Sequence, residues 1–143
     1  MSWTTDLLHG IAADLATAGI GVWQPDGPAY SSGQTGIYIA SLRENPDTAI
    51  CLTDYPLTQL GAGDMTVGLQ VRTRAGADVD AVTALRDAVF DRLNGREHLS
   101  FGSVRVALIA WQSGVWLGEN ETHRMERTDN YWITAARASA LSY

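Results

Sequence analysis

Hydrophobic positions recur at helical spacing in two stretches of the chain. In residues 3–18, "WTTDLLHGIAADLATA", the apolar side chains share one side of a helix, and Gly19 is typical of the residue that ends one. Ser2 or Thr4 can cap its first turn. A second helix is predicted after Asp78, in "VDAVTALRDAVFDRLNG", with the turn Asn94–Gly95 at its end. The apolar residues on the two faces are Leu7, Leu8, Ile11, Leu15 and Ala18, then Val79, Val82, Leu85, Val89 and Leu93.

The remaining apolar segments are typical of strands. "IYIASL" and "TAICLTDY" are rich in β-branched and aromatic residues, and "MTVGLQVRT" alternates apolar and polar positions. "SVRVALIAWQ" predicts a long strand that continues past a bend at Gly114 into "VWLG". The last strand is predicted over Arg124 to Arg137, with Met125, Arg127, Asp129, Tyr131 and Ile133 on one face.

This order of elements predicts an α+β fold with one domain over residues 1–143. Short turns between strands favour a mostly antiparallel sheet of about four to five strands, with two helices packed on one face. Residues 19–36 and 56–64 are rich in glycine, proline and polar residues and are predicted to be long loops. Residues 138–143 are predicted to form a mobile tail.

Composition narrows the classes of function. The net charge of −6 disfavours nucleic acid as a bound partner, since neutralising phosphates needs a basic face. All ten basic residues are arginine, which reflects either codon bias or the use of arginine at protein interfaces. The single cysteine, Cys51, excludes an internal disulfide and is predicted to be buried. No signal peptide or membrane span is predicted, so we expect the protein in a cytoplasm or in a particle assembled there.

The densest cluster of polar residues is "LGENETHRMERTDN", Leu117 to Asn130. His123 is its only histidine, and its oxygen-bearing residues lack the spacing of a calcium loop, so neither zinc nor calcium binding is predicted. Glu119, Glu121 and Glu126 offer paired carboxylates, but nothing nearby predicts the raised pKa that acid–base catalysis needs. The cluster is predicted to be the exposed turn and flanks of a β-hairpin, with no catalytic residue and no cofactor.

Three tryptophans on the late strands, Trp111, Trp116 and Trp132, admit two interpretations. Each side chain is either part of the core or part of an interface, where large aromatic residues are enriched.

Taken in order, four segments resemble the tail terminator, or minor capsid, proteins of long-tailed bacteriophages. "PDTAICLTDYP" resembles the first core strand of that family, and "MTVGLQVRTRAGADVDAVTALRDAVFDRLNG" its central strand and long helix. "SVRVALIAWQSGVWLGENETHR" resembles the third strand with its bend, and "RMERTDNYWITA" the final strand. The resemblance covers about residues 1–136.

The resemblance implies a structural virion protein and not an enzyme. Proteins of this family form a ring, typically hexameric, that caps the tail tube, stops its polymerisation and provides the surface for joining the head. The implied partners are other copies of the chain, the tail tube protein and the head–tail connector or stopper protein, with DNA passing through the ring unbound. The implied location is the head-proximal end of the tail. The acidic composition suits a lumen that does not retain DNA.

We expect the 114–127 hairpin and the loops 23–36 and 56–64 to contact neighbouring proteins. The residues proposed for this assembly interface are Trp116, Glu119, Glu121, His123, Arg124 and Arg127. Reversing the charges of Arg124 and Arg127 is expected to impair head joining without unfolding the chain.

Three alternatives stay open at this point. The chain is a neighbouring neck component, such as a head-completion or stopper protein; a small hydrolase that uses Glu119, Glu121 or Glu126 with His123; or a module that binds a peptide strand at its sheet edge.

Overall fold

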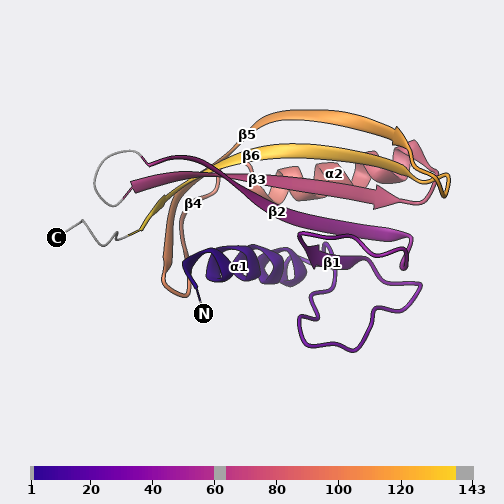
Figure 1. The fold of residues 1–143 in the computed structure, drawn as a ribbon, viewed down its shortest axis with the longest axis horizontal. Helices are drawn as coiled ribbons and strands as arrows, with labels where there is room; N and C mark the ends of the chain where they lie inside the picture. The colour runs from indigo at the N-terminus through magenta and orange to yellow at the C-terminus, as the bar shows by residue number, and fades with distance from the viewer. Residues whose placement is uncertain (1, 60–63, 138–143) are drawn as a thin grey trace.

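The computed structural model describes residues 2–59 and 64–137, which form two helices and one curled sheet (Figure 1). The elements are, in chain order, α1 (Trp3–Thr17), β1 (Gly36–Ile39), β2 (Thr48–Gln59), β3 (Asp64–Ala75), α2 (Val79–Leu93), β4 (Glu97–Phe101), β5 (Val104–Glu119) and β6 (Met125–Ala136). The predicted α+β class is therefore confirmed.

The sheet differs from the prediction in strand number and in one pairing. It has six strands in the order β1-β2-β3-β6-β5-β4. β1 pairs with β2 in parallel, and the other neighbours are antiparallel. β4 was not predicted because "EHLSF" has only five residues and too few apolar positions to set a clear pattern; its pairing with β5 gives it strand conformation.

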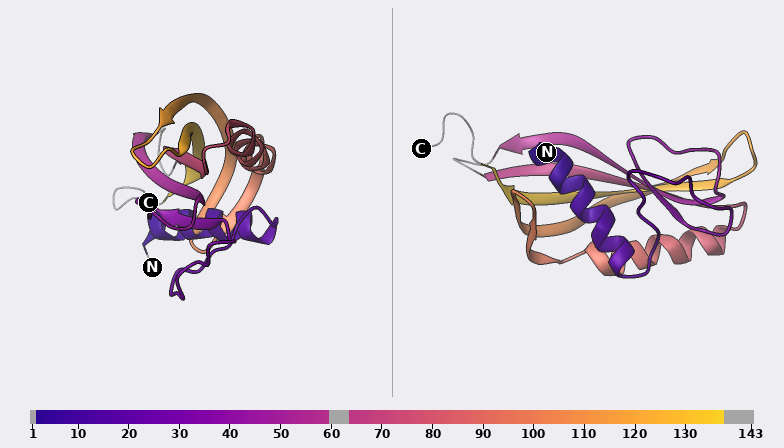
Figure 2. Two further views of the ribbon diagram at one scale, coloured as in Figure 1. Left: turned by 90° about the vertical axis from the view of Figure 1, so that its right-hand side faces the viewer. Right: turned by 90° about the horizontal axis from the view of Figure 1, so that it is seen from below.

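Both helices pack their apolar sides against the same face of the sheet, which curls around them (Figure 2). Leu69 and Val71 of β3 and Tyr131 and Ile133 of β6 lie on this face, as the alternating pattern predicts, and each is at most 1% exposed. Helix residues in the same cluster are Leu7, Leu8, Ile11, Ala12 and Leu15 of α1 and Val89 and Leu93 of α2. No helix of residues 2–59 and 64–137 lies on the opposite face of the sheet.

The predicted helix caps are present. The Ser2 hydroxyl accepts a hydrogen bond from the Thr5 amide at 3.1 Å, and Asp78 accepts one from the Asp80 amide at 2.9 Å. Gly19 follows α1 with φ of 78°, the left-handed conformation expected after a helix. The ends of both helices are thus set by local sequence.

One predicted loop is confirmed and the other is wrong. Residues 19–35 are irregular, and Val22 forms a bridge with Gly36 at the edge of the sheet. Within the predicted loop 56–64, residues 56–59 belong to β2 and Asp64 begins β3, while residues 60–63 lie outside the described residues. β2 accommodates Pro56 by a shift of register between Pro56 and Thr58. The predicted mobile tail 138–143 lies outside the described residues.

Cys51 lies on the sheet face that carries no helix, yet it is only 3% exposed. Burial raises the pKa of its thiol above the ordinary value, so the thiolate is disfavoured. Its predicted role as a small buried residue is confirmed.

Candidate functional site

The hairpin between β5 and β6 projects at one end of the sheet, where the sequence predicted it (Figure 1). Asn120 organises its turn, because the Asn120 side-chain oxygen accepts hydrogen bonds from the backbone amides of Thr122 and Arg124 at 2.9 and 3.0 Å. His123 adopts a left-handed φ of 62° within this turn.

The six predicted interface residues divide into two groups. Glu119 and His123 have side chains 52% and 86% exposed, and Glu121 is also exposed. Trp116 is 36% exposed. The side chains of the two arginines, Arg124 and Arg127, are only 12% and 18% exposed, and their ionic contacts lie within the chain. The structure thus brings four of the six to the surface.

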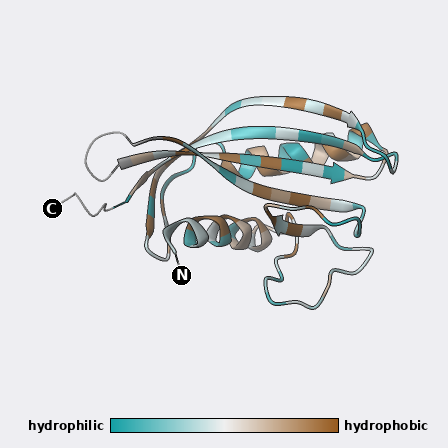
Figure 3. Cartoon of the chain, in the orientation of Figure 1, coloured by the Kyte–Doolittle hydropathy of each residue, from teal (hydrophilic) through white to brown (hydrophobic). Residues whose placement is uncertain are grey.

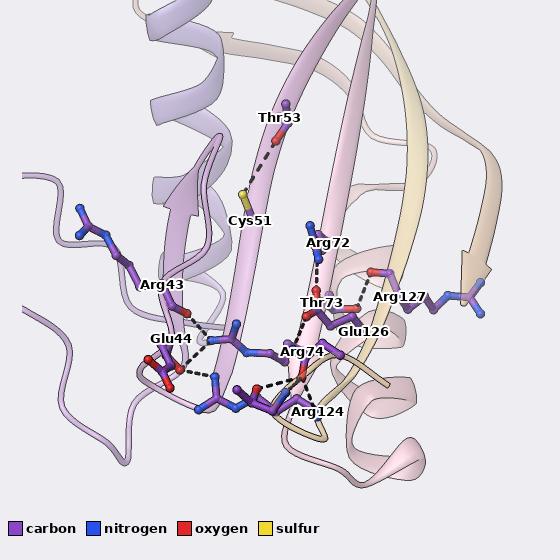
Figure 4. A network of polar contacts seen from close by, with 12 residues as sticks. Arg43, Glu44, Cys51, Thr53, Arg72, Thr73, Arg74, Arg124, Glu126 and Arg127 are labelled. Carbon is purple, nitrogen blue, oxygen red and sulfur yellow. Dashed lines mark hydrogen bonds and ion pairs between the residues drawn. The ribbon is translucent and has the colours of Figure 1, made fainter. Parts of the chain in front are cut away.

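Arg124 and Arg74 attach the hairpin and β3 to residues 43–47, the segment before β2 (Figure 4). Arg74 is 4% exposed, and its guanidinium donates to the carbonyl oxygens of residues 43, 44, 46 and 47. Arg124 donates to the carbonyl oxygen of Glu44 and forms an ion pair with Asp47 at 2.7 Å. The planar guanidinium can satisfy several carbonyl groups at once, which a lysine cannot.

Glu126 is a buried carboxylate, contrary to the prediction of an exposed hairpin flank. It is 3% exposed and accepts hydrogen bonds from Arg72 Nε and, at 2.6 Å, from Asn120 Nδ2 (Figure 4). It lines a polar hollow of about 550 Å³, whose lining includes neither His123 nor Glu119.

The residues considered for a hydrolase lie in two places. His123 Nδ1 lies 2.6 Å from Glu119 Oε1, with both side chains in solvent at the turn, whereas Glu126 is bonded inside the sheet. A shared cleft around a perturbed carboxylate is what such catalysis requires. The geometry supports no hydrolytic role for these residues.

Asp129 forms a second buried ionic network on the helix-covered face. It is 2% exposed and accepts hydrogen bonds from Arg127 Nε at 3.0 Å, Arg86 Nε at 3.1 Å and Trp111 Nε1 at 3.0 Å. Burial by itself raises the pKa of Asp129, but these hydrogen bonds outweigh it and hold the pKa below its ordinary value. The network connects α2 to both strands of the hairpin.

Cation–π contacts extend this network to the hairpin. The Arg86 guanidinium lies over the rings of Phe90 and Trp111, and that of Arg127 lies 5.4 Å from the centre of the Trp116 ring. Of the three late tryptophans, Trp111 packs against the core and Trp116 against Arg127, whereas Trp132 is 45% exposed on the opposite face.

Trp132 lies in an apolar hollow on the helix-free face, which the sequence analysis did not predict. The hollow measures about 410 Å³, and four strands contribute to it. Its lining residues are Leu57, Thr66, Leu108, Ala110, Gln112, Trp132 and Thr134. Strand alternation placed these residues on one face, but bringing them together requires the pairing of β2, β3, β6 and β5.

Neither a metal cluster nor a membrane span emerges from the part of the chain that the structure describes. Over residues 2–59 and 64–137, no group of three or more His, Cys, Asp or Glu side chains is placed to hold a metal ion. No described helix is long and apolar enough to cross a membrane.

A protein-family model described as "Bacteriophage tail terminator protein" matches residues 15–137. The chain belongs to this family. The tail terminator resemblance found in the sequence is thereby confirmed, and the chain is a structural virion protein of a phage-type tail. No curated protein matches the sequence.

The fold of this tail terminator family member is also present in a solved particle. A chain in the virion of a native gene transfer agent particle is similar to it, with a TM-score of 0.60 and 12% sequence identity. The similarity covers 90% of this chain and 91% of that chain. At this identity the likeness shows that the two chains share a fold.

Proposed function

We propose that this protein is the tail terminator of a phage-type particle, and that its copies form a hexameric ring on the head-proximal end of the tail tube. The ring stops tube polymerisation, provides the surface for head joining and leaves a hole through which DNA passes. The observation that carries this proposal is the family match over residues 15–137. Its partners are then the tail tube protein and the connector or stopper protein of the neck, and it assembles in the host cytoplasm.

The exposed end of the hairpin suits a contact with one of these partners. Glu119, Glu121 and His123 are exposed at the tip of the hairpin, and Trp116 lies next to it on β5 with 36% exposure. The base of the hairpin is held by buried ionic contacts through Glu126 and Asp129. A rigid projecting hairpin loses little conformational entropy on binding, which favours its use in assembly. We assign Arg124 and Arg127 to holding the hairpin in place.

The net charge supports the passage of DNA. A chain of net charge −6 repels phosphates, so a ring built from it does not retain nucleic acid by general electrostatics.

Electron microscopy of particles made without this gene tests the proposal. Overlong tail tubes without heads are expected, and supplying the gene on a plasmid should restore tails of normal length with heads attached. Tails of normal length that fail to join heads would instead assign the chain to the neck, as a head-completion or stopper protein. Infectious particles in normal yield would contradict both assignments.

A further inference from the structure

Beyond Trp111, the edge of β5 is not covered by any strand of the described residues. β4 pairs with β5 only from Val104 to Leu108, and the Asn94 side-chain oxygen then accepts the Trp111 amide at 2.9 Å. From Gln112 to Glu119, no strand within residues 2–59 and 64–137 pairs with this side of β5. An unpaired strand edge presents free backbone donors and acceptors to another chain.

The part of this edge from Val115 to Leu117 is apolar and uncharged. Val115 is 55% exposed and Leu117 is 49% exposed. The sequence from Val106 to Gly118 contains no charged residue, and Figure 3 colours much of β5 white to brown. Large apolar groups held in solvent on a projecting strand are typical of an interaction site.

The other edge of the sheet is protected. The outer side of β1 is bonded by Val22, and the Tyr30 hydroxyl donates to the Ile37 carbonyl. β2 extends beyond β1, but there it carries Pro56 and a shift of register, both of which hinder strand addition. The uncovered part of β5 contains no proline, although its own register shifts near Trp111 and Trp116 interrupt a regular ladder. Side chains must therefore contribute to a contact here.

The apolar hollow around Trp132 is equally unpartnered and is complementary in character. None of its seven lining residues is charged, and Leu57, Leu108 and Trp132 are 38%, 38% and 45% exposed. It lies on the helix-free face and is formed at the paired parts of β2 and β5, whereas Val115 lies farther along β5 toward the hairpin. One chain thus carries a projecting apolar edge and an apolar hollow at separate places.

We propose that the Val115–Leu117 edge of one copy packs into the Trp132 hollow of a neighbouring copy. This inference rests on the proposed function, in which copies of the chain assemble. Two copies of net charge −6 repel one another, and this repulsion is weakest between surfaces that carry no charge. A contact between two different surfaces of the same chain is head-to-tail, the type of contact that closes into a ring.

Opposite charges placed in the two surfaces test this contact. Trp132→Glu places an acid in the hollow, and Val115→Lys places a base on the edge. Each is introduced into the full chain and expressed alone, or together with the other, in cells infected with the phage that lacks this gene. Val79→Glu is the matched control, because Val79 is an apolar residue 46% exposed on α2 and belongs to neither surface. Circular dichroism and thermal unfolding of the purified variants confirm that each is folded.

Each variant alone is expected to lower the yield of infectious particles at least about tenfold, and the control to leave it near normal. Expressed together, the two variants are expected to restore particles, because a lysine-bearing edge then meets a glutamate-bearing hollow on a neighbouring copy. Normal yield from either folded variant alone would overturn the proposal. Loss without rescue would also overturn it, since it would mean that these surfaces bind another protein.

The gene deletion separates this inference from the proposed function. Overlong tubes in the deletion, with normal tails from Trp132→Glu, would keep the terminator role and reject the edge-to-hollow contact. A deletion without effect on tails would reject the terminator role itself.

Discussion

Gly114 of β5 and Asp129 of β6 lie so close that a Cβ atom at position 114 would come within 2.4 Å of Asp129 Oδ1. The same atom would lie 2.6 Å from Arg127 Nη2. The bend that the sequence placed at Gly114 is therefore where the buried ionic network of the hairpin occupies the space of a side chain. The glycine allows β5 to pass over the ion pair between Arg127 and Asp129.

Gly114→Ala is expected to destabilise the chain by about 1–3 kcal/mol, since the methyl group displaces a carboxylate that three donors hold in place. Urea unfolding monitored by circular dichroism measures the change. Gly33→Ala serves as the control, because a Cβ atom there meets nothing within 4 Å, and its effect should stay within about 0.5 kcal/mol. Equal free energies of unfolding for the two variants would mean that Asp129 and its partners can shift to admit the methyl group without loss of stability.

Asp129→Asn is expected to cost about 3–5 kcal/mol, because it leaves Arg86 and Arg127 without their buried counter-charge. Asp87→Asn removes a carboxylate that also bonds to Arg86, but its side chain is 56% exposed, so we expect less than about 1 kcal/mol. Thermal and urea unfolding of both variants compare them directly. A loss at Asp129 no larger than that at Asp87 would contradict the importance assigned to the network.

Asp14 predicts how stability depends on pH. Burial raises its pKa, but the hydrogen bonds and charges of Arg92 and Arg96 outweigh burial and hold the pKa below its ordinary value. A pKa lower in the folded than in the unfolded chain stabilises the fold above about pH 4, and the contribution is lost as the pH falls further. Free energies of unfolding for the wild type and Asp14→Asn should therefore converge between about pH 5 and pH 2.5. A constant difference across that range would argue against this assignment.

Arg74→Lys is expected to destabilise the chain by about 1–3 kcal/mol, since one ammonium group cannot satisfy the carbonyl oxygens that the guanidinium bonds. Hydrogen exchange should show faster exchange in residues 40–47 than in the wild type. Arg105→Lys is the matched control, because Arg105 is exposed and, among the described residues, its guanidinium donates to the Ser100 hydroxyl alone. Unchanged exchange in residues 40–47 would show that Arg74 does not hold this segment.

Glu119→Arg combined with Glu121→Arg tests the exposed hairpin tip. Both side chains are in solvent, so the unfolding midpoint should stay close to that of the wild type, whereas particle assembly should fall. Negative-stain electron microscopy of the particles measures the fraction of tails joined to heads. A normal fraction of joined tails would mean that the hairpin tip is not part of the assembly interface.

Reversing the charges of Arg124 and Arg127 tests the folding of the hairpin and not, as the sequence suggested, an exposed binding surface. Both guanidinium groups are bonded within the chain, to Asp47 and Asp129. The double variant is therefore expected to lose stability, and a drop in its particle yield would report on folding rather than on a binding surface.

The sequence by itself determined the elements that local physics controls. The helices follow from apolar spacing and from caps such as Asp78, and the face of β3 that enters the core follows from its alternation, because these signals act over a few residues. The hairpin turn and the buried position of Cys51 were predicted on the same basis.

Only the tertiary structure decided which polar residues are internal. Glu126 and Asp129 belong to a segment that the sequence predicts to be an exposed turn and its flanks. In the structure Glu126 is paired with Arg72, 54 positions away, and Asp129 with Arg86, 43 positions away, so that both acids are buried and neutralised. The Trp132 hollow likewise needs Leu57 from β2 beside residues of β5 and β6. These features depend on strand order, and strand order is set by contacts between distant segments that local periodicity does not record.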